Sequence, residues 1–215
     1  FVRKVEPRNT PTVIGACRNK KNFWDGRAKN IFNGVSPHGL ADEEVSVPWF
    51  DGTSITQKQL AITQQSCASQ AVGPVLSTFE MTCAGSSFAD VGRKMLNKSS
   101  ALQKQIVSPD DSVLGALSNA TLNPGAAGLS QSYLQMVQAA FQDTVIGGSG
   151  LNGYTTAELN FPLIFGLAVA AYEETLDPDQ SPFDLTPRHP APSPDPSALV
   201  PVNSAAKPGF LQRGP

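Results

Sequence analysis

The chain has 215 residues, of which 40% are hydrophobic, and carries a formal net charge of −2 with an isoelectric point near 5.7. This length supports one sizeable domain or two small ones, and the slightly acidic balance excludes the basic field that would attract nucleic acid or an anionic membrane. The longest apolar run, residues 161–171, contains Pro162 and Gly166 and is shorter than the roughly 20 residues of a membrane span. We therefore expect a buried core, no nucleic-acid partner and no membrane span.

The first 50 residues of the chain are expected to be mostly irregular. Residues 1–50 are rich in Gly, Pro and Asn and have no sustained helical period, which favours loops and turns. A short hairpin is expected near residues 45–56. In the same region, Ser54 or Thr56 is a candidate N-cap for a short helix that runs on through Thr63.

Two helices are expected in the middle of the chain. Residues 87–97 carry apolar side chains at helical spacing, which predicts one buried stripe. Ser108 is followed by a proline and two aspartates, the pattern of an N-cap with acids in the first turn. It predicts a helix that continues through Leu117.

Two more helices are expected further on. Residues 130–142 have the amphipathic spacing of a surface helix, with Ser130 as its N-cap. The last helix is expected to begin at Thr155 or Thr156 and to end near Leu176. It is apolar on nearly all sides, which predicts a place in the core.

The composition divides the chain near residue 177. Nine of its eighteen prolines lie between Pro178 and Pro208, and apolar side chains there are too sparse to offset the entropy of ordering. Residues 177–215 are thus expected to form an extended linker or wrapping arm behind a domain of residues 1–176. The fold class expected for that domain is mainly α with long loops, which a sheet of four or more strands would contradict.

Cysteine and histidine are scarce. Cys17, Cys67 and Cys83 include no Cys-x-x-Cys-His motif, so this chain has no site for covalent attachment of a c-type haem. The two histidines, His38 and His189, are too few for a self-contained zinc site, and His189 lies in the proline-rich segment.

Four short motifs nevertheless occur in a recognisable order. The motifs are PRNTPT at 7–12, FWDGR at 23–27, QAVGP at 70–74 and EM at 80–81. Together they resemble the stretch between the two haem-attachment sites of the bacterial di-haem cytochrome c peroxidase and MauG-type family, over roughly residues 1–185.

The resemblance implies a cytochrome c-like di-haem scaffold that is incomplete in this chain. Two c-type haems would be attached by sequence before residue 1 and after residue 215, in other segments or chains. Peroxide reduction with electron transfer between the haems is the implied reaction, in the periplasm or outside the cell. Its other partners would be peroxide or oxygen and a small redox protein or organic reductant.

The resemblance also implies roles for residues near the peroxide-binding haem. Gln70 and Glu80 match the family's distal glutamine and glutamate. A carboxylate there can take a proton from one peroxide oxygen and return it to the other. Met81 is expected to contact the cofactor. Without the motif, Glu80 would be an ordinary solvated surface group.

Two more residues have implied roles between the haems. Trp24 matches a tryptophan that helps electrons to pass, and Asn9 matches an asparagine whose side-chain oxygen binds calcium. One asparagine does not define a calcium site, which needs six to eight oxygens. The alternatives are a buried Trp24 that anchors a turn at Asp25–Gly26, and an Asn9 that stabilises a turn before Pro11.

His38 is an unusual residue in this region. The branch of the family with longer chains, which includes the secreted haem rubber oxygenases, is similar here but has an aromatic residue near this position. His38 is a candidate distal base or axial iron ligand, and a surface-loop histidine is the commoner outcome.

The spacing of the motifs also resembles this large-chain branch, because about 45 residues separate Trp24 from Gln70. Two alternatives to a peroxidase therefore stay open: a haem-dependent oxygenase of the rubber-oxygenase type, and a non-catalytic scaffold or electron-transfer subunit.

Two structural expectations follow from the resemblance. Trp24 and Glu80 should converge on one cavity, lined also by Asn9 and Gln70, with His38 within reach of its rim. A disulfide should join Cys67 to Cys83 and leave Cys17 free, with three free buried thiols as the alternative.

Overall fold

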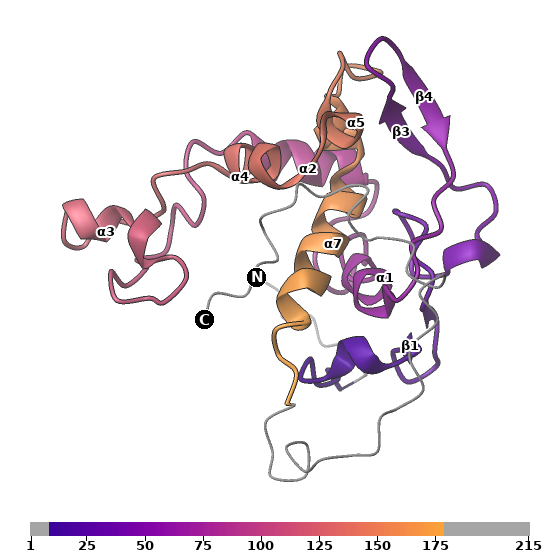
Figure 1. Ribbon diagram of the computed structural model, residues 1–215, viewed down its shortest axis with the longest axis horizontal. Helices are drawn as coiled ribbons and strands as arrows, with labels where there is room; N and C mark the ends of the chain where they lie inside the picture. The colour runs from indigo at the N-terminus through magenta and orange to yellow at the C-terminus, as the bar shows by residue number, and fades with distance from the viewer. Residues whose placement is uncertain (1–8, 179–215) are drawn as a thin grey trace, which may run out of the picture.

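The computed structural model describes residues 9–178. Within this range, short helices and two small hairpins are joined by long loops, and Figure 1 shows the longest helix, α7, near the centre. The elements are η1 (Ala16–Arg18), β1 (Lys21–Asn22), β2 (Ala28–Lys29), η2 (Gly39–Ala41), β3 (Val47–Phe50), β4 (Ile55–Lys58), α1 (Ser66–Val72), α2 (Phe88–Leu96), η3 (Gly115–Leu117), α3 (Asn119–Leu122), α4 (Tyr133–Ala140), α5 (Asp143–Ile146), α6 (Thr156–Leu159) and α7 (Phe161–Glu173).

The two sheets of the described residues are antiparallel and two-stranded. Strand β1 pairs with β2, and β3 pairs with β4 in a register that joins Val47 to Lys58. The hairpin expected near residues 45–56 is confirmed. The helix expected from Ser54 or Thr56 is wrong, because Asp51 Oδ1 accepts the N–H groups of Thr53 and Ser54, both at 2.8 Å, and closes the turn that leads into β4. The architecture is therefore mixed α/β, and the expectation of a mainly α fold holds only loosely.

The main core lies between α1 and α7. A Cβ atom at Gly166 of α7 would lie 3.0 Å from Phe32 Cζ and 3.1 Å from the Ala68 carbonyl oxygen of α1. Glycine at this position therefore lets the two helices approach closely. The fully buried side chains around this contact include Phe32, Val72, Val145 and Leu163.

The helix expected over residues 87–97 is confirmed as α2. The expected helix of residues 130–142 is observed as the shorter α4. It is capped by Ser132 and not by Ser130, because Ser132 Oγ accepts from the Gln135 N–H at 3.2 Å while Gln135 Oε1 accepts from the Ser132 N–H at 2.8 Å.

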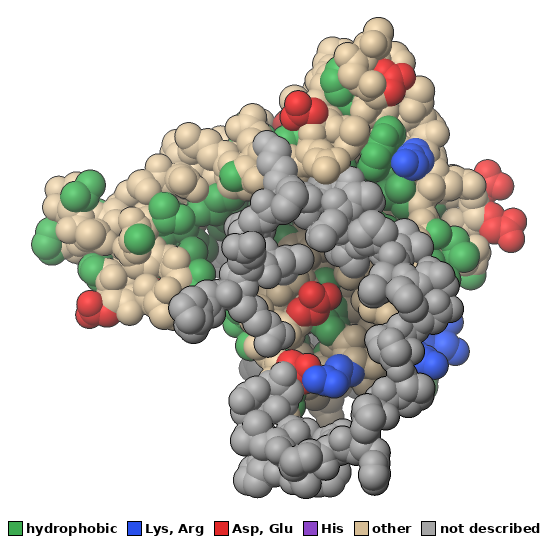
Figure 2. Space-filling model, viewed as in Figure 1, with side chains coloured by type: hydrophobic (Ala, Val, Ile, Leu, Met, Phe, Trp, Pro, Cys, Tyr) green, Lys and Arg blue, Asp and Glu red, His purple; other side chains and the backbone are tan. Residues whose placement is uncertain are grey.

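An arm of residues 98–132 projects away from the core (Figure 1). The helix expected from Ser108 is wrong: Asp111 Oδ1 accepts the N–H groups of Val113 and Leu114 at 2.9 and 2.7 Å, and only the short η3 follows. The arm has its own small core around Ala101, Val107 and Leu129. Hydrophobic side chains also lie along its surface (Figure 2), where Ile106, Val113 and Leu122 are exposed.

The last expected helix is observed as two helices. Thr155 caps α6, which confirms the expected start of the helix. The helix is interrupted at Asn160, and α7 begins at the next residue. Asn160 Nδ2 donates to the carbonyl oxygens of Pro48 and Val145, both at 2.7 Å. These hydrogen bonds link the junction between α6 and α7 to β3 and α5. Residues 179–215, which include most of the expected linker and His189, lie outside the described residues. Within residues 9–178, no helix is long and apolar enough to cross a membrane.

Candidate functional site

A cavity of about 790 Å³ lies where the N-terminal segment, the β1–β2 turn and the end of α1 meet. Its lining brings together Asn9, Trp24, Gln70 and Glu80, which come from four separate segments of the sequence. The volume is within the range of about 300–1,000 Å³ that is usual for ligand pockets.

Trp24 lies in the turn between β1 and β2. Asp25 Oδ1 accepts from the Arg27 N–H at 3.2 Å, and the Arg27 guanidinium pairs with the Asp25 carboxylate at 3.0 Å. Burial raises the pKa of Asp25, but its hydrogen bonds to Arg27 lower it more, so the net pKa lies below the usual value. The turn expected at Asp25–Gly26 therefore exists. The buried Trp24 of the alternative interpretation does not, because the residue is 79% exposed.

Phe23 takes the anchoring role instead. Its ring packs on Gly73, where a Cβ atom would lie 3.1 Å from Phe23 Cζ. The Arg27 guanidinium covers the ring at 3.8 Å from its centroid, an attractive geometry for a cation. Gly73 follows α1 directly, so this contact holds the Trp24 turn against the end of the helix that carries Gln70.

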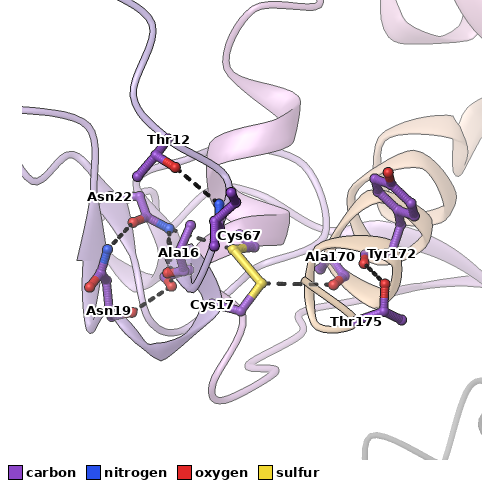
Figure 3. The surroundings of a disulfide bond; sticks show 11 residues. Thr12, Ala16, Cys17, Asn19, Asn22, Cys67, Ala170, Tyr172 and Thr175 are labelled. Carbon is purple, nitrogen blue, oxygen red and sulfur yellow. Dashed lines mark hydrogen bonds between the residues drawn. A yellow bond between two sulfur atoms is a disulfide. The ribbon is translucent and has the colours of Figure 1, made fainter. Parts of the chain in front are cut away.

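A disulfide lies next to Asn22, one of the residues that line the cavity (Figure 3). Cys17 of η1 bonds to Cys67 in the first turn of α1, with Cα atoms 5.3 Å apart and 50 residues between the two positions. The expected Cys67–Cys83 bridge is wrong, and Cys83 is an exposed free thiol. The physical reason is that η1 folds back onto the start of α1, whereas Cys83 lies in the loop that leads away from the end of the helix.

Buried amide and hydroxyl groups support this disulfide (Figure 3). Asn22 is 5% exposed, and its Nδ2 lies 3.3 Å from Ser66 Oγ and 3.4 Å from the Ala16 carbonyl oxygen. Ser66 Oγ in turn donates to the Asn19 carbonyl oxygen at 2.6 Å. These contacts fix β1 to α1, and no sequence motif pointed to them.

Gln70 Oε1 is buried at the cavity and has no hydrogen-bond donor within the described residues. A buried acceptor without a partner costs about 1–3 kcal/mol, so an unpaired oxygen on a cavity wall indicates where a bound group would donate. Glu80 lies on the same cavity with an exposed side chain, and its backbone N–H donates to the Ser77 carbonyl oxygen at 3.1 Å.

The other expected site residues are not brought together in this way. Met81 is exposed and lines a different cavity. His38 is exposed just before η2 and does not line the cavity, which agrees with a surface-loop histidine. Asn9 does line the cavity, but no cluster of three His, Cys, Asp or Glu side chains within residues 9–178 includes a residue of its lining. Among residues 9–178, His, Cys, Asp and Glu side chains converge in threes only at Cys17, Cys67 and Glu173.

The family model for di-haem cytochrome c peroxidase matches residues 2–189. The chain belongs to the di-haem cytochrome c peroxidase family. Neither the curated proteins nor the solved structures contain a match to it.

Members of this family use c-type haems, and the cavity of this family member fits such a group. The unpaired Gln70 Oε1 faces it, and the exposed aromatic rings of Trp24 and Phe79 line it. Lys21 and Arg27 on the same wall offer positive charge for haem propionates. Covalent attachment needs cysteines from elsewhere, because Cys17 and Cys67 are bonded to each other and Cys83 is isolated.

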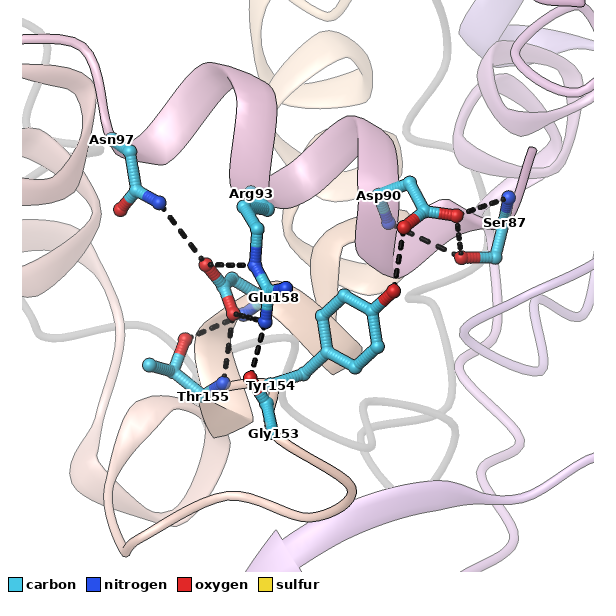
Figure 4. Close-up of polar contacts among 8 residues, drawn as sticks. All are labelled: Ser87, Asp90, Arg93, Asn97, Gly153, Tyr154, Thr155 and Glu158. Carbon is cyan, nitrogen blue, oxygen red and sulfur yellow. Dashed lines mark hydrogen bonds and ion pairs between the residues drawn. The ribbon is translucent and has the colours of Figure 1, made fainter.

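A second polar cluster fastens α2 to α6 on another part of this peroxidase-family chain (Figure 4). The Glu158 carboxylate is 4% exposed, pairs with the Arg93 guanidinium at 3.2 Å and accepts from the Thr155 N–H at 2.9 Å. Burial raises the pKa of Glu158, but the Arg93 and Thr155 hydrogen bonds together lower it below its usual value.

Asp90 in the same cluster completes the capping box of α2, whose N-cap is Ser87. Its carboxylate accepts from Ser87 Oγ at 2.6 Å and from the Tyr154 hydroxyl at 2.5 Å. The Ser87 hydrogen bond, followed by that from Tyr154, lowers the pKa of Asp90 to about 2.

Proposed function

We propose that this chain forms the wall of the peroxide-binding haem site in a di-haem oxidoreductase that reduces peroxide. The single observation that carries the proposal is the convergence of Asn9, Trp24, Gln70 and Glu80 on one cavity. These residues are up to 71 positions apart, and each belongs to a different family motif.

Glu80 is proposed as the general acid and base. A bound haem would supply the redox-active iron. The exposed Glu80 carboxylate takes the proton from one peroxide oxygen and returns it to the oxygen that leaves, and it exchanges protons with solvent at the cavity mouth. Gln70 positions the peroxide, because its unpaired Oε1 accepts a hydrogen bond and its Nε2 donates one.

Trp24 is proposed as the electron relay. Its indole lies at the cavity with 79% of the residue exposed, so a second redox group can contact it from outside this chain. Asn9, on the same wall, is proposed as one oxygen ligand of a calcium ion, with the other ligands from sequence beyond the described residues.

The cellular location, the branch of the family and the choice between peroxide and oxygenase chemistry are also proposals. The Cys17–Cys67 disulfide supports a periplasmic or secreted location, because disulfides persist in oxidising compartments. The long spacing between the Trp24 and Gln70 motifs supports the large-chain branch. Glu80 on the cavity favours peroxide chemistry over rubber-type oxygenation, for which an apolar lining would be expected.

The test is Glu80→Gln in the complete, haem-loaded protein. Peroxide turnover should fall roughly 10²- to 10⁴-fold, the usual contribution of a general acid–base group, while the visible haem spectrum stays unchanged. Glu43→Gln is the matched control, because Glu43 is exposed and lies outside this cavity. If Glu80→Gln kept the wild-type rate of peroxide turnover, Glu80 would not be the general acid and base.

A further inference from the structure

A second cavity, of about 610 Å³, lies beside the first. The segment around residues 79–83 separates the two, because Glu80 lines the haem-facing cavity whereas Met81 and Cys83 line the second one. Helix α2 forms much of its wall, and Tyr133 of α4 and the start of the arm complete it. No step of the proposed peroxide chemistry uses this cavity.

The charge of the second cavity is positive. Lys94, Lys98 and Lys104 line it, and none of the three forms an ion pair with a described residue. Among the described residues that line it, Asp90 is the one acid, and the Asp90 carboxylate is already bonded to Ser87 and Tyr154. Three unpaired cations in one cavity stand out in a chain whose net charge is −2.

The floor of the second cavity is apolar. Val75 is 1% exposed, and Val91, Met95 and Leu102 lie around it. Such a surface favours the flat body of an organic molecule over a small hydrated ion.

Two polar groups complete the wall. Thr82 Oγ1 is buried without a hydrogen-bond partner within the described residues. The Tyr133 hydroxyl oxygen accepts from the Leu102 N–H at 3.3 Å, which leaves its own O–H free to donate. Both hydroxyls can therefore donate to an acceptor that enters the cavity.

We propose that this second cavity binds a small aromatic carboxylate. The ring of the ligand lies on Val91, Met95 and Leu102, and its carboxylate lies among Lys94, Lys98 and Lys104. The assignment is independent of the peroxide chemistry proposed above, since it uses neither Glu80 nor Gln70.

Cys83 provides a direct reporter of occupancy, because it is an exposed free thiol on the lining. A ligand in the cavity should slow the reaction of Cys83 with a thiol reagent. We would follow that reaction in the complete protein with increasing 2-naphthoate, and measure the dissociation constant in parallel by calorimetry. Cys83→Ser identifies the labelling signal that belongs to this thiol.

The expected result is saturable protection of Cys83 by 2-naphthoate and at least tenfold weaker protection by the neutral analogue 2-naphthalenemethanol. Lys94→Gln/Lys98→Gln should weaken naphthoate binding about tenfold or more, because each hydrogen bond to a charged group is worth about 1.5–3 kcal/mol. The control Lys20→Gln/Lys58→Gln removes two lysines that do not line the cavity and should bind as the wild type does.

Equal binding of the charged and neutral compounds, or unchanged naphthoate binding in Lys94→Gln/Lys98→Gln, would overturn the proposal. Glu80→Gln should bind naphthoate with the wild-type constant. Failure of the catalytic assignment and failure of this site therefore give different results.

Discussion

The cavity lined by Trp24, Gln70 and Glu80 and the α2–α6 junction use polar side chains in different ways. At the junction, Glu158 is 4% exposed and both of its carboxylate oxygens are hydrogen-bonded to neighbours such as Arg93. At the cavity, Gln70 Oε1 is buried without a donor and Trp24 is 79% exposed. The Glu158 carboxylate therefore belongs to the scaffold, whereas Gln70 Oε1 lies on a cavity wall, where a bound group could supply the missing donor.

The two regions also differ in how they are fastened. The cavity wall is built from strands of two residues and a helix of seven, which are too short to be stable alone. A disulfide and the buried Asn22 hold them. The longer α2 and the adjoining α6 are joined through Glu158 and Arg93 instead.

Loss of the disulfide should have the largest effect on stability. Cys17→Ser/Cys67→Ser opens a loop closed over 50 residues, and the free energy of unfolding should fall by about 4 kcal/mol. Denaturant titration measures the change. Cys83→Ser removes an exposed free thiol and should leave the unfolding midpoint unchanged. If the double variant unfolded at the wild-type midpoint, the disulfide would not stabilise the fold.

Breaking the ion pair at the junction should cost less. Glu158→Gln keeps the shape of the side chain but removes its charge, and should lower the free energy of unfolding by about 2 kcal/mol. This is below the ~3–5 kcal/mol of a fully buried pair, because the Arg93 side chain is 42% exposed. Glu44→Gln, an exposed control, should change little, and a similar loss in both variants would show that the Arg93 contact adds nothing.

Two carboxyl groups, Asp90 at the junction and Glu173 beside the disulfide, should respond oppositely to acid. The pKa of Asp90 is lowered from 3.8 to about 2, so its stabilising contribution is complete above pH 3.8 and is lost as the pH falls towards 2. Beside the disulfide, burial raises the pKa of Glu173 above 4.5. The ionised Glu173 therefore destabilises the folded state at neutral pH, and protonation relieves this as the pH falls.

Unfolding midpoints measured from pH 2 to 7 separate these effects. Asp90→Asn should flatten the loss of stability between pH 4 and pH 2 relative to the wild type. Glu173→Gln should instead raise stability at pH 7, with the gain shrinking as the wild-type carboxyl is protonated. A Glu173→Gln variant that is destabilised at pH 7 would contradict the assigned direction.

Replacement of Gln70 should have the smallest effect on stability. Gln70→Met removes an acceptor that has no partner, so the free energy of unfolding should stay the same or rise slightly, while peroxide turnover falls. Asn160→Leu is the contrasting variant, because Asn160 Nδ2 donates to two carbonyl oxygens, although its Oδ1, like Gln70 Oε1, has no partner within the described residues. It should lose about 2 kcal/mol, since those carbonyls are left unpaired. If Gln70→Met and Asn160→Leu lost the same free energy of unfolding, Gln70 would contribute to stability as Asn160 does, and the two residues would not differ in role.

Local patterns were enough for several elements of this chain. The apolar spacing of residues 87–97 predicted α2, and the residues around Thr155 predicted the start of α6, because caps and helical stripes depend on neighbours within one or two turns. The four family motifs likewise predicted that Asn9, Trp24, Gln70 and Glu80 would share one cavity, as the structure places them.

Contacts between distant segments decided the rest. Thr56 entered a strand because β3 offered a partner, and Cys67 bonded to Cys17 because η1 folds back onto α1. Trp24 is exposed because Phe23 already packs on Gly73. The sequence by itself was enough for the family resemblance, for α2 and for the start of α6. Only the tertiary structure decided the disulfide, the unpaired Gln70 oxygen and the second cavity, because each depends on groups far apart in the chain that meet only after folding.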